Sequence, residues 1–138
     1  MKYDISALGN ALVDTQYKVS SEFLSGVGIE ADTMTLASAE EQAPIIEKLI
    51  SMGSESVSDC GGSATNSLVA AANYGSNCHH VCRVADDEDG TRYLDSLRAA
   101  GVKHIGVSSE NSDMPTGKCL ILVTPDAKRT MISMLGVS

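Results

Sequence analysis

The stretch Asp59-Cys60-Gly61-Gly62-Ser63-Ala64-Thr65-Asn66 decides how the chain folds, because an extended run ends there in two glycines and a helix of small residues begins at once. A strand that turns into a helix at Gly-Gly lets backbone N–H groups at the helix N-terminus approach a ligand closely. The pattern therefore predicts that this turn forms the floor of a ligand-binding site. The alternative is a tight turn between strand and helix without a binding role.

Composition narrows the class of protein to which the chain can belong. The 138 residues are 43% hydrophobic and 20% charged, which predicts one soluble globular domain. A net charge of −8 argues against a nucleic-acid partner, since phosphate binding needs a basic face. No apolar run reaches membrane-spanning length, and the first residues lack the apolar core of a signal peptide. We therefore expect a cytoplasmic protein that acts on a small molecule and binds no membrane.

The four cysteines show no disulfide framework, so free thiols are expected. Cys78, His80 and Cys82 alternate and would share one face of a strand, which is an arrangement that could hold a metal. No second pair of ligands is evident, and cysteine often serves as a small buried hydrophobe in strands. The sequence therefore favours a structural role for these residues, and no metal site is predicted.

Hydrophobic periodicity predicts alternating strands and helices. Strands are expected at residues 3–8, 12–19, 34–36, 55–60, 78–84, 103–107, 118–124 and 129–134. Helices are expected around 22–24, from the capping box at 38–41 to about 52, from the Gly-Gly turn to Gly75, and from the acidic turn at 86–90 to about 100. This alternation indicates an α/β fold whose mainly parallel sheet has helices on both faces.

Several segments carry more specific expectations. Residues 3–8 read as a buried strand, whereas 12–19, 34–36 and 55–60 are short or alternate with polar residues and suggest a separate, smaller sheet. Pro44 lies too deep for a first helical turn, which predicts a kink or a helix that starts later. Residues 125–128 are typical of a hairpin turn, and 110–115 read as a plain loop.

Four short motifs follow one another along most of the chain. They are Gly9-Asn10-Ala11-Leu12-Val13-Asp14, Gly61-Gly62-Ser63-Ala64-Thr65-Asn66, Val84-Ala85-Asp86-Asp87-Glu88-Asp89-Gly90, and Thr116-Gly117 with Thr124-Pro125-Asp126-Ala127-Lys128-Arg129-Thr130. In this order they resemble the N-terminal half of the ribokinase-like (PfkB) carbohydrate kinases, and most of all the adenosine-kinase-type branch.

The resemblance implies a fold and an activity. The fold is α/β, with a partial Rossmann-like core of the three-layer ribokinase type and a small β-sheet lid from strands near 12–19, 34–36 and 55–60. The activity is ATP-dependent phosphorylation, with Mg²⁺, of a primary hydroxyl of an adenosine-like nucleoside or a ribose-like or fructose-like sugar. This chain would be the N-terminal part, and the ATP-binding C-terminal half would lie outside it.

The resemblance also assigns roles to residues. Asp14 would accept hydrogen bonds from sugar hydroxyls, since carboxylate and amide groups suit vicinal hydroxyls. Arg129 would stabilise the transferring phosphoryl group, because its planar fork of donors matches phosphate oxygens. The remaining residues of the implied sugar site are Asn10, Gly61, Gly62 and Asn66.

The sequence departs from the family in one respect that matters. It has no Gly-Ala-Gly-Asp segment, which carries the family's catalytic base, so we expect the 138 residues alone to be inactive. One alternative is a truncated, non-catalytic module that binds a sugar, a nucleoside or another subunit. A homodimer through the lid or an exposed sheet edge also fits. A dinucleotide-binding oxidoreductase is disfavoured, because no G-x-G-x-x-G follows the first strand.

Overall fold

The chain divides into two compact units in the computed structural model, which describes residues 2–108 and 113–138. The first unit comprises Met1–Val13, Asp59–Gly117 and Leu135–Ser138, and the second comprises Asp14–Ser58 and Lys118–Met134. Each unit is therefore built from segments that are distant in sequence. Of the loop predicted at 110–115, residues 110–112 lie outside the described part.

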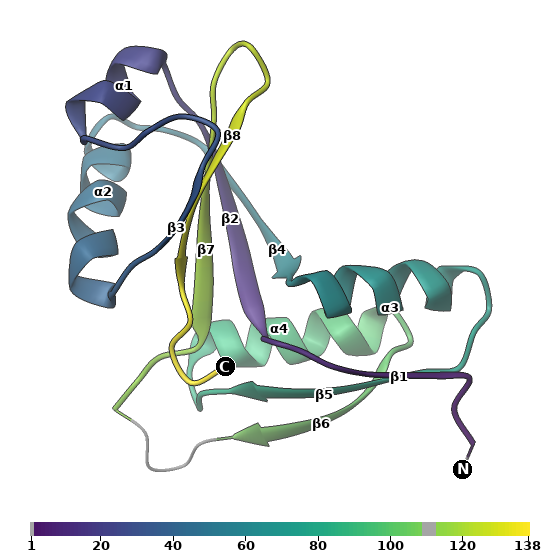
Figure 1. The fold of residues 1–138 in the computed structure, drawn as a ribbon. Helices are drawn as coiled ribbons and strands as arrows, with labels where there is room; N and C mark the ends of the chain where they lie inside the picture. Colours follow the sequence, from purple (N-terminus) through teal and green to yellow (C-terminus); the bar gives the residue numbers. More distant parts are fainter. Residues whose placement is uncertain (1, 109–112) are drawn as a thin grey trace. The chain divides into compact units, whose positions relative to one another are not determined.

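The first unit contains a three-stranded parallel sheet in the order β1-β5-β6 (Figure 1). Its strands are β1 (Ile5–Leu8), β5 (Cys78–Val84) and β6 (Lys103–Ser108), and its helices are α3 (Ser63–Asn73) and α4 (Glu88–Ala99). Side chains from both helices join the inward-facing residues of β5 in one core, whose members include Leu68, Cys78, Cys82, Val84, Tyr93 and Leu97. Both helices therefore lie on the same face of this sheet.

The other face of this sheet corrects one expectation. Leu8, Val81 and Ile105 lie in register across the three strands, on the face opposite the α3 and α4 core. Leu8 is 81% exposed and Ile105 is 58% exposed. The prediction of a buried first strand is wrong, because the two helices of this unit cover only one of its faces. The prediction that helices cover both faces of this sheet is likewise not met, because α3 and α4 lie on the same face.

The second unit is built around a five-stranded mixed sheet in the order β3-β8-β7-β2-β4. The strands are β2 (Leu12–Lys18), β3 (Met34–Leu36), β4 (Ser56–Gly61), β7 (Gly117–Val123) and β8 (Arg129–Met134). Helices α1 (Ser21–Gly26) and α2 (Ala39–Ser51) pack on one face of it, around a core that includes Tyr17, Phe23, Leu49, Leu120, Leu122 and Ile132. The three polar or short strands do belong to a sheet other than the parallel one.

Helix α2 begins where its capping box predicts. The Ser38 N–H donates to Glu41 Oε2 at 2.7 Å, and the Glu41 N–H donates to Ser38 Oγ at 3.2 Å. Together these bonds fix the first turn. Pro44 lies inside the helix, so the expectation of a later start is wrong. Near the end of the helix, Leu49 is buried in the core of this unit, whereas Ile50 is 63% exposed.

The predicted hairpin at the end of the chain is confirmed. Strands β7 and β8 pair in antiparallel fashion, and the register ends at Val123 opposite Arg129. In the turn, the Ala127 N–H donates to the Thr124 carbonyl at 2.9 Å, and Ala127 has a φ of 63°. This turn places Arg129 at the first position of β8.

Candidate functional site

The Gly-Gly turn at the start of α3 requires glycine at its second position. Gly62 is the N-cap of α3 with a φ of 97°, and a Cβ built on it would lie 2.6 Å from the Asn10 carbonyl oxygen. Both the backbone angle and the close approach exclude a side chain there. Among the described residues no side chain caps this helix end, so no cap satisfies the first N–H groups of α3. The turn thus brings Asn10 and Gly62 together within the first unit.

The helix that follows is held from its buried side. The Thr65 hydroxyl and the Tyr93 hydroxyl are 2.5 Å apart and share a hydrogen bond, which ties α3 to α4. Thr65 is fully buried, whereas Asn66, the next residue, is exposed. The Asn66 N–H donates to the Gly62 carbonyl at 3.0 Å, so the side chain of Asn66 leaves the helix one turn beyond the glycines.

Asp14 and Arg129 lie in the second unit, on the face of the five-stranded sheet opposite α1 and α2. Strand residues alternate between faces, and Tyr17, Leu120 and Ile132 belong to the helix-covered core. The face without helices therefore carries Asp14 on β2, Cys119 on β7 and Arg129 on β8. Burial raises the pKa of the Cys119 thiol, the Ser133 hydroxyl lowers it, and the charges of Asp14 and Arg129 shift it in opposite directions.

The same face also carries apolar side chains. Met34, Met131 and Ile121 are in register on three adjacent strands, and Met131 alternates with the core residue Ile132. Met34 is 60% exposed. Ile121, by contrast, is 7% exposed, so this row, on the same side of the sheet as Asp14 and Arg129, is exposed at its Met34 end and buried at its Ile121 end.

The predicted site residues therefore form two sets. Asn10, Gly61, Gly62 and Asn66 lie in the first unit, and Asp14 and Arg129 lie in the second. Within the first set, Gly61 is buried whereas the side chains of Asn10 and Asn66 are exposed. Within the second, Asp14 is half-buried and Arg129 is exposed. Each set combines groups that can bind hydroxyls or phosphate oxygens.

The acidic motif also has a structural role, because Asp87 accepts several hydrogen bonds that join the start of α4 to Thr116. Its carboxylate accepts from the Gly90 N–H at 2.7 Å, the Thr116 N–H at 2.9 Å and the Thr116 hydroxyl at 2.6 Å. A Cβ on Gly90 would lie 2.3 Å from the Ala85 carbonyl oxygen, so this turn also needs glycine. The sequence signal was present, because Asp87 stands three residues before Gly90 at an N-cap.

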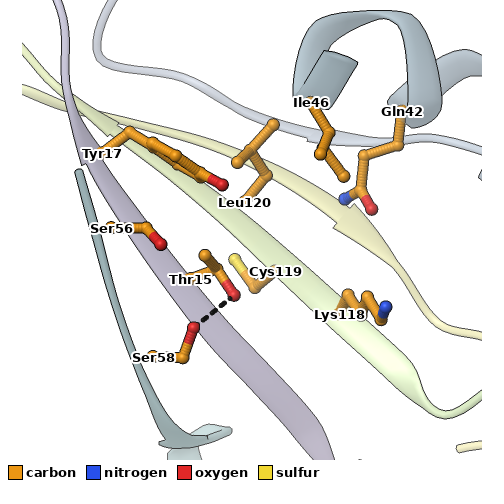
Figure 2. A pocket seen from close by; sticks show the side chains of 9 residues that line it. All are labelled: Thr15, Tyr17, Gln42, Ile46, Ser56, Ser58, Lys118, Cys119 and Leu120. Atoms are coloured by element: carbon orange, nitrogen blue, oxygen red, sulfur yellow. Dashed lines mark hydrogen bonds between the residues drawn. The ribbon is translucent and has the colours of Figure 1, made fainter. Parts of the chain in front are cut away.

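A second feature that the sequence did not reveal is a pocket on the helix-covered face of the second unit (Figure 2). Thr15 and Tyr17 of β2 line it. Since residues alternate along the strand, the pocket lies on the opposite side of β2 from Asp14. It is therefore distinct from the surface that carries the predicted site residues.

The described residues give no sign of a metal centre. Cys78, His80 and Cys82 are all buried on the helix-covered face of β5, as their alternation predicts. Across residues 2–108 and 113–138, no three His, Cys, Asp or Glu side chains are grouped so that they could hold a metal ion. No described helix is both long and apolar enough to cross a membrane.

Comparison with known proteins places these features in a family. Residues 29–138 match the pfkB family carbohydrate kinases. The chain belongs to this family. It is 29% identical over 144 aligned residues to the adenosine kinase of Saccharomyces cerevisiae, which covers all of this chain and 41% of the yeast protein. The chain therefore spans about two fifths of the length of that relative.

Solved structures of pfkB-type kinases agree with the fold. A probable sugar kinase from Rhizobium etli CFN 42 has a TM-score of 0.84 and 31% identity, over 98% of this chain and 39% of its own. The adenosine kinase from Sinorhizobium meliloti has a TM-score of 0.81 and 30% identity, over 99% and 40%. The predicted fold class, α/β of the ribokinase type and present in part, is thus confirmed.

Proposed function

We propose that this pfkB-family chain supplies the sugar-binding part of a kinase that phosphorylates a primary hydroxyl of a nucleoside or sugar with ATP. The observation that carries the proposal is the position of Asp14. Asp14 is half-buried on the face of the five-stranded sheet opposite α1 and α2, where its carboxylate can accept hydrogen bonds from a substrate. A carboxylate there can hold two vicinal hydroxyls of a ribose ring and thereby orient the ring.

A nucleoside is the favoured substrate class. Met34, Met131 and Ile121 form an apolar row on the same face as Asp14, and a planar base can bury apolar surface against the exposed Met34 end of this row. The adenosine kinases of yeast and Sinorhizobium meliloti among the relatives point in the same direction. We propose that the base lies against this row while the sugar hydroxyls reach Asp14. Asn10, Gly62 and Asn66 are proposed as sugar-binding residues of the first unit.

Strands β2, β3 and β4 belong to the lid in this proposal. A sheet that carries both a sugar-binding carboxylate and an apolar row can cover a bound nucleoside and keep water from the reacting hydroxyl. Arg129, exposed at the start of β8, is assigned to the phosphate oxygens, because a guanidinium offers paired donors to them.

ATP supplies the phosphoryl group in the proposed reaction, and Mg²⁺ accompanies it. The described residues fit only a small share of this task. They contain no cluster of carboxylates that could hold the metal ion, and the sequence has no Gly-Ala-Gly-Asp segment. We therefore assign binding and orientation of the acceptor to this chain, and neither the catalytic base nor the metal ligands.

Substitution of Asp14 tests the proposal directly. In calorimetric titrations of the 138-residue chain with adenosine, ribose and fructose, adenosine should bind most tightly. Asp14→Asn should weaken adenosine binding by about 2 to 4 kcal/mol, as expected when a charged acceptor of two hydroxyls is removed. Gln16→Asn, a change two positions along the same strand face, is the matched control and should leave binding within a few-fold.

Two outcomes would count against the proposal. Equal affinity of wild type and Asp14→Asn for every ligand would remove the sugar-binding role of the carboxylate. Phosphorylation of adenosine by the 138 residues alone, at a rate abolished by Asp14→Ala, would show that the chain contains its own base. Ligand binding without a kinase in the full protein would instead support the non-catalytic module.

A further inference from the structure

The pocket on the helix-covered face of the second unit is lined by side chains from α2 and from strands β2, β4 and β7 (Figure 2). Its volume is about 220 Å³, which is small beside typical drug-sized sites of 300 Å³ or more. Every lining residue belongs to the second unit, so its geometry is set within that unit. The size suits a molecule of a few carbon atoms.

Two deeply buried side chains present polar atoms to this pocket. Tyr17 is only 6% exposed and Gln42 only 2% exposed, yet both line the cavity. Gln42 Nε2 donates to the Ile132 carbonyl at 2.9 Å, which fixes the amide in place. Among the described residues no group bonds the Gln42 Oε1 or the Tyr17 hydroxyl. Neither atom is sealed from solvent, so each faces the pocket and can pair with a hydroxyl group of a ligand.

The strand side of the pocket adds further hydroxyl groups. Thr15 Oγ1 and Ser58 Oγ are 3.0 Å apart and hydrogen-bonded across β2 and β4, and Ser56 lies beside them (Figure 2). Hydroxyl groups both donate and accept, so they can match a ligand that does the same. Leu120 and Ile46 supply apolar surface. No carboxylate lines the pocket, and its one cationic side chain is Lys118.

We propose that this pocket binds a small polyhydroxylated molecule, between a triose and a pentose in size. Hydroxyl groups of the ligand would pair with Tyr17, Gln42, Thr15 and Ser56, and its C–H groups would lie over Leu120. The site is on the opposite face of β2 from Asp14, so it is separate from the acceptor site of the proposed kinase. It makes no use of the residues assigned to that reaction, and it stands whether or not the chain belongs to an active kinase.

Residue-resolved NMR of the 138-residue chain with D-ribose tests this site. Saturable shifts are expected at the amides of Ser56, Ser58 and Lys118, with a dissociation constant near about 1 mM. Tyr17→Phe, which removes only a hydroxyl, should weaken these shifts roughly tenfold. Asp14→Asn lies on the same strand but on its other face, and it should leave them unchanged.

The two sites give separable results in this experiment. Shifts at Ile121 and Met131, on the same sheet face as Asp14, that vanish in Asp14→Asn report the proposed acceptor site and say nothing against the pocket. The pocket is refuted if Ser56 and Ser58 show no saturable shift, or if Tyr17→Phe binds as wild type does while its melting temperature is unchanged. If Tyr17→Phe is unstable, Thr15→Val replaces it, with the same expected loss.

Discussion

Ala127 occupies a backbone conformation that favours glycine. Its φ of 63° lies in the left-handed region, which costs a residue with a Cβ about 1 to 2 kcal/mol. The turn tolerates this because Thr124 accepts from the Ala127 N–H and the Thr124 N–H donates to the Lys128 carbonyl. The position is a local weakness in the hairpin that presents Arg129.

Ala127→Gly should therefore stabilise the chain. The gain expected is roughly 0.5 to 1 kcal/mol, since relief of the strain exceeds the extra entropy that glycine gives the unfolded chain. Urea unfolding of the variant and of wild type measures it. Lys128→Gly, one residue later, is the control and should not stabilise. A lower midpoint for Ala127→Gly would contradict this reading of the turn.

His80 is a buried imidazole without a counter-charge. It is fully buried on β5, and within the described residues neither of its ring nitrogens has a hydrogen-bond partner. Burial lowers its pKa most, and His104 and His79 lower it further. His104 lies beside it on β6, Tyr93 of α4 is hydrogen-bonded to Thr65, and α3 contains no charged side chain at all. The folded chain therefore favours neutral His80.

Acid should destabilise the chain through this residue. Because the unfolded histidine titrates near about 6.5 and the folded one lower, the unfolded chain binds more protons below that pH. The contribution of neutral His80 to the free energy of unfolding is thus fully present above about pH 6.5. It is lost as the pH falls, by up to about 1.4 kcal/mol per pH unit. Unfolding curves from pH 7.5 to 5 should show a shallower loss for His80→Leu. An identical slope for His80→Leu would disprove this role, and His79→Gln controls for loss of any histidine on β5.

At the scale of elements, the start of α4 depends on one carboxylate. Asp87 caps the helix and at the same time binds both the N–H and the hydroxyl of Thr116, which itself accepts from the Ala85 N–H at 3.0 Å. Removal of the carboxylate would leave several of these groups unpaired. This network explains why Thr116-Gly117 accompanies the acidic motif at 84–90.

Asp87→Ala should cost about 2 to 3 kcal/mol of stability, which combines a lost helix cap with an unpaired Thr116 N–H. The adjacent Asp86→Ala is a matched control, because Asp86 is exposed, and it should change stability by less than about 0.5 kcal/mol. Thermal unfolding of the two variants distinguishes them. Similar losses in both would indicate a general effect of acidic residues at this helix start.

Most elements could be predicted from the sequence, whereas their burial and pairing could not. Local signals fixed the capping box at Ser38, the Gly62 turn and the hairpin before Arg129, since each depends on neighbouring residues. The position of β8 between β3 and β7 depends on contacts across about a hundred residues, and no local pattern encodes it. The exposure of Leu8 could not be predicted for the same reason. The sequence of an apolar strand is the same whether helices cover one face of its sheet or both.

Across the described chain, the uncovered face of the three-stranded sheet is the surface that most favours association with other molecules. Leu8, Val81 and Ile105 form an apolar row that α3 and α4 leave uncovered, although parallel sheets are normally covered on both faces. Such a row promotes association with other apolar surfaces.

We expect the 138 residues to self-associate through this row. Leu8→Lys should weaken association by about tenfold or more, since burial of one leucine is worth about 2 kcal/mol. Sedimentation velocity over a range of concentrations measures it. Tyr74→Lys is the control, because Tyr74 is 92% exposed at the end of α3 and lies outside the row. A wild-type chain that stays monomeric at high concentration would contradict this expectation.

The strand order of the second unit also determines when β3 can pair during synthesis of the chain. Strand β8, at Arg129–Met134, lies between β3 and β7, so β3 has no partner strand until the last hairpin has left the ribosome. At typical translation rates of 5 to 20 residues per second, the ribosome needs roughly 5 to 20 s to add the residues that separate Leu36 from Met134. During this interval the apolar side chains of β3 and α2 remain accessible in the nascent chain, and a chaperone that shields them would find its substrate there.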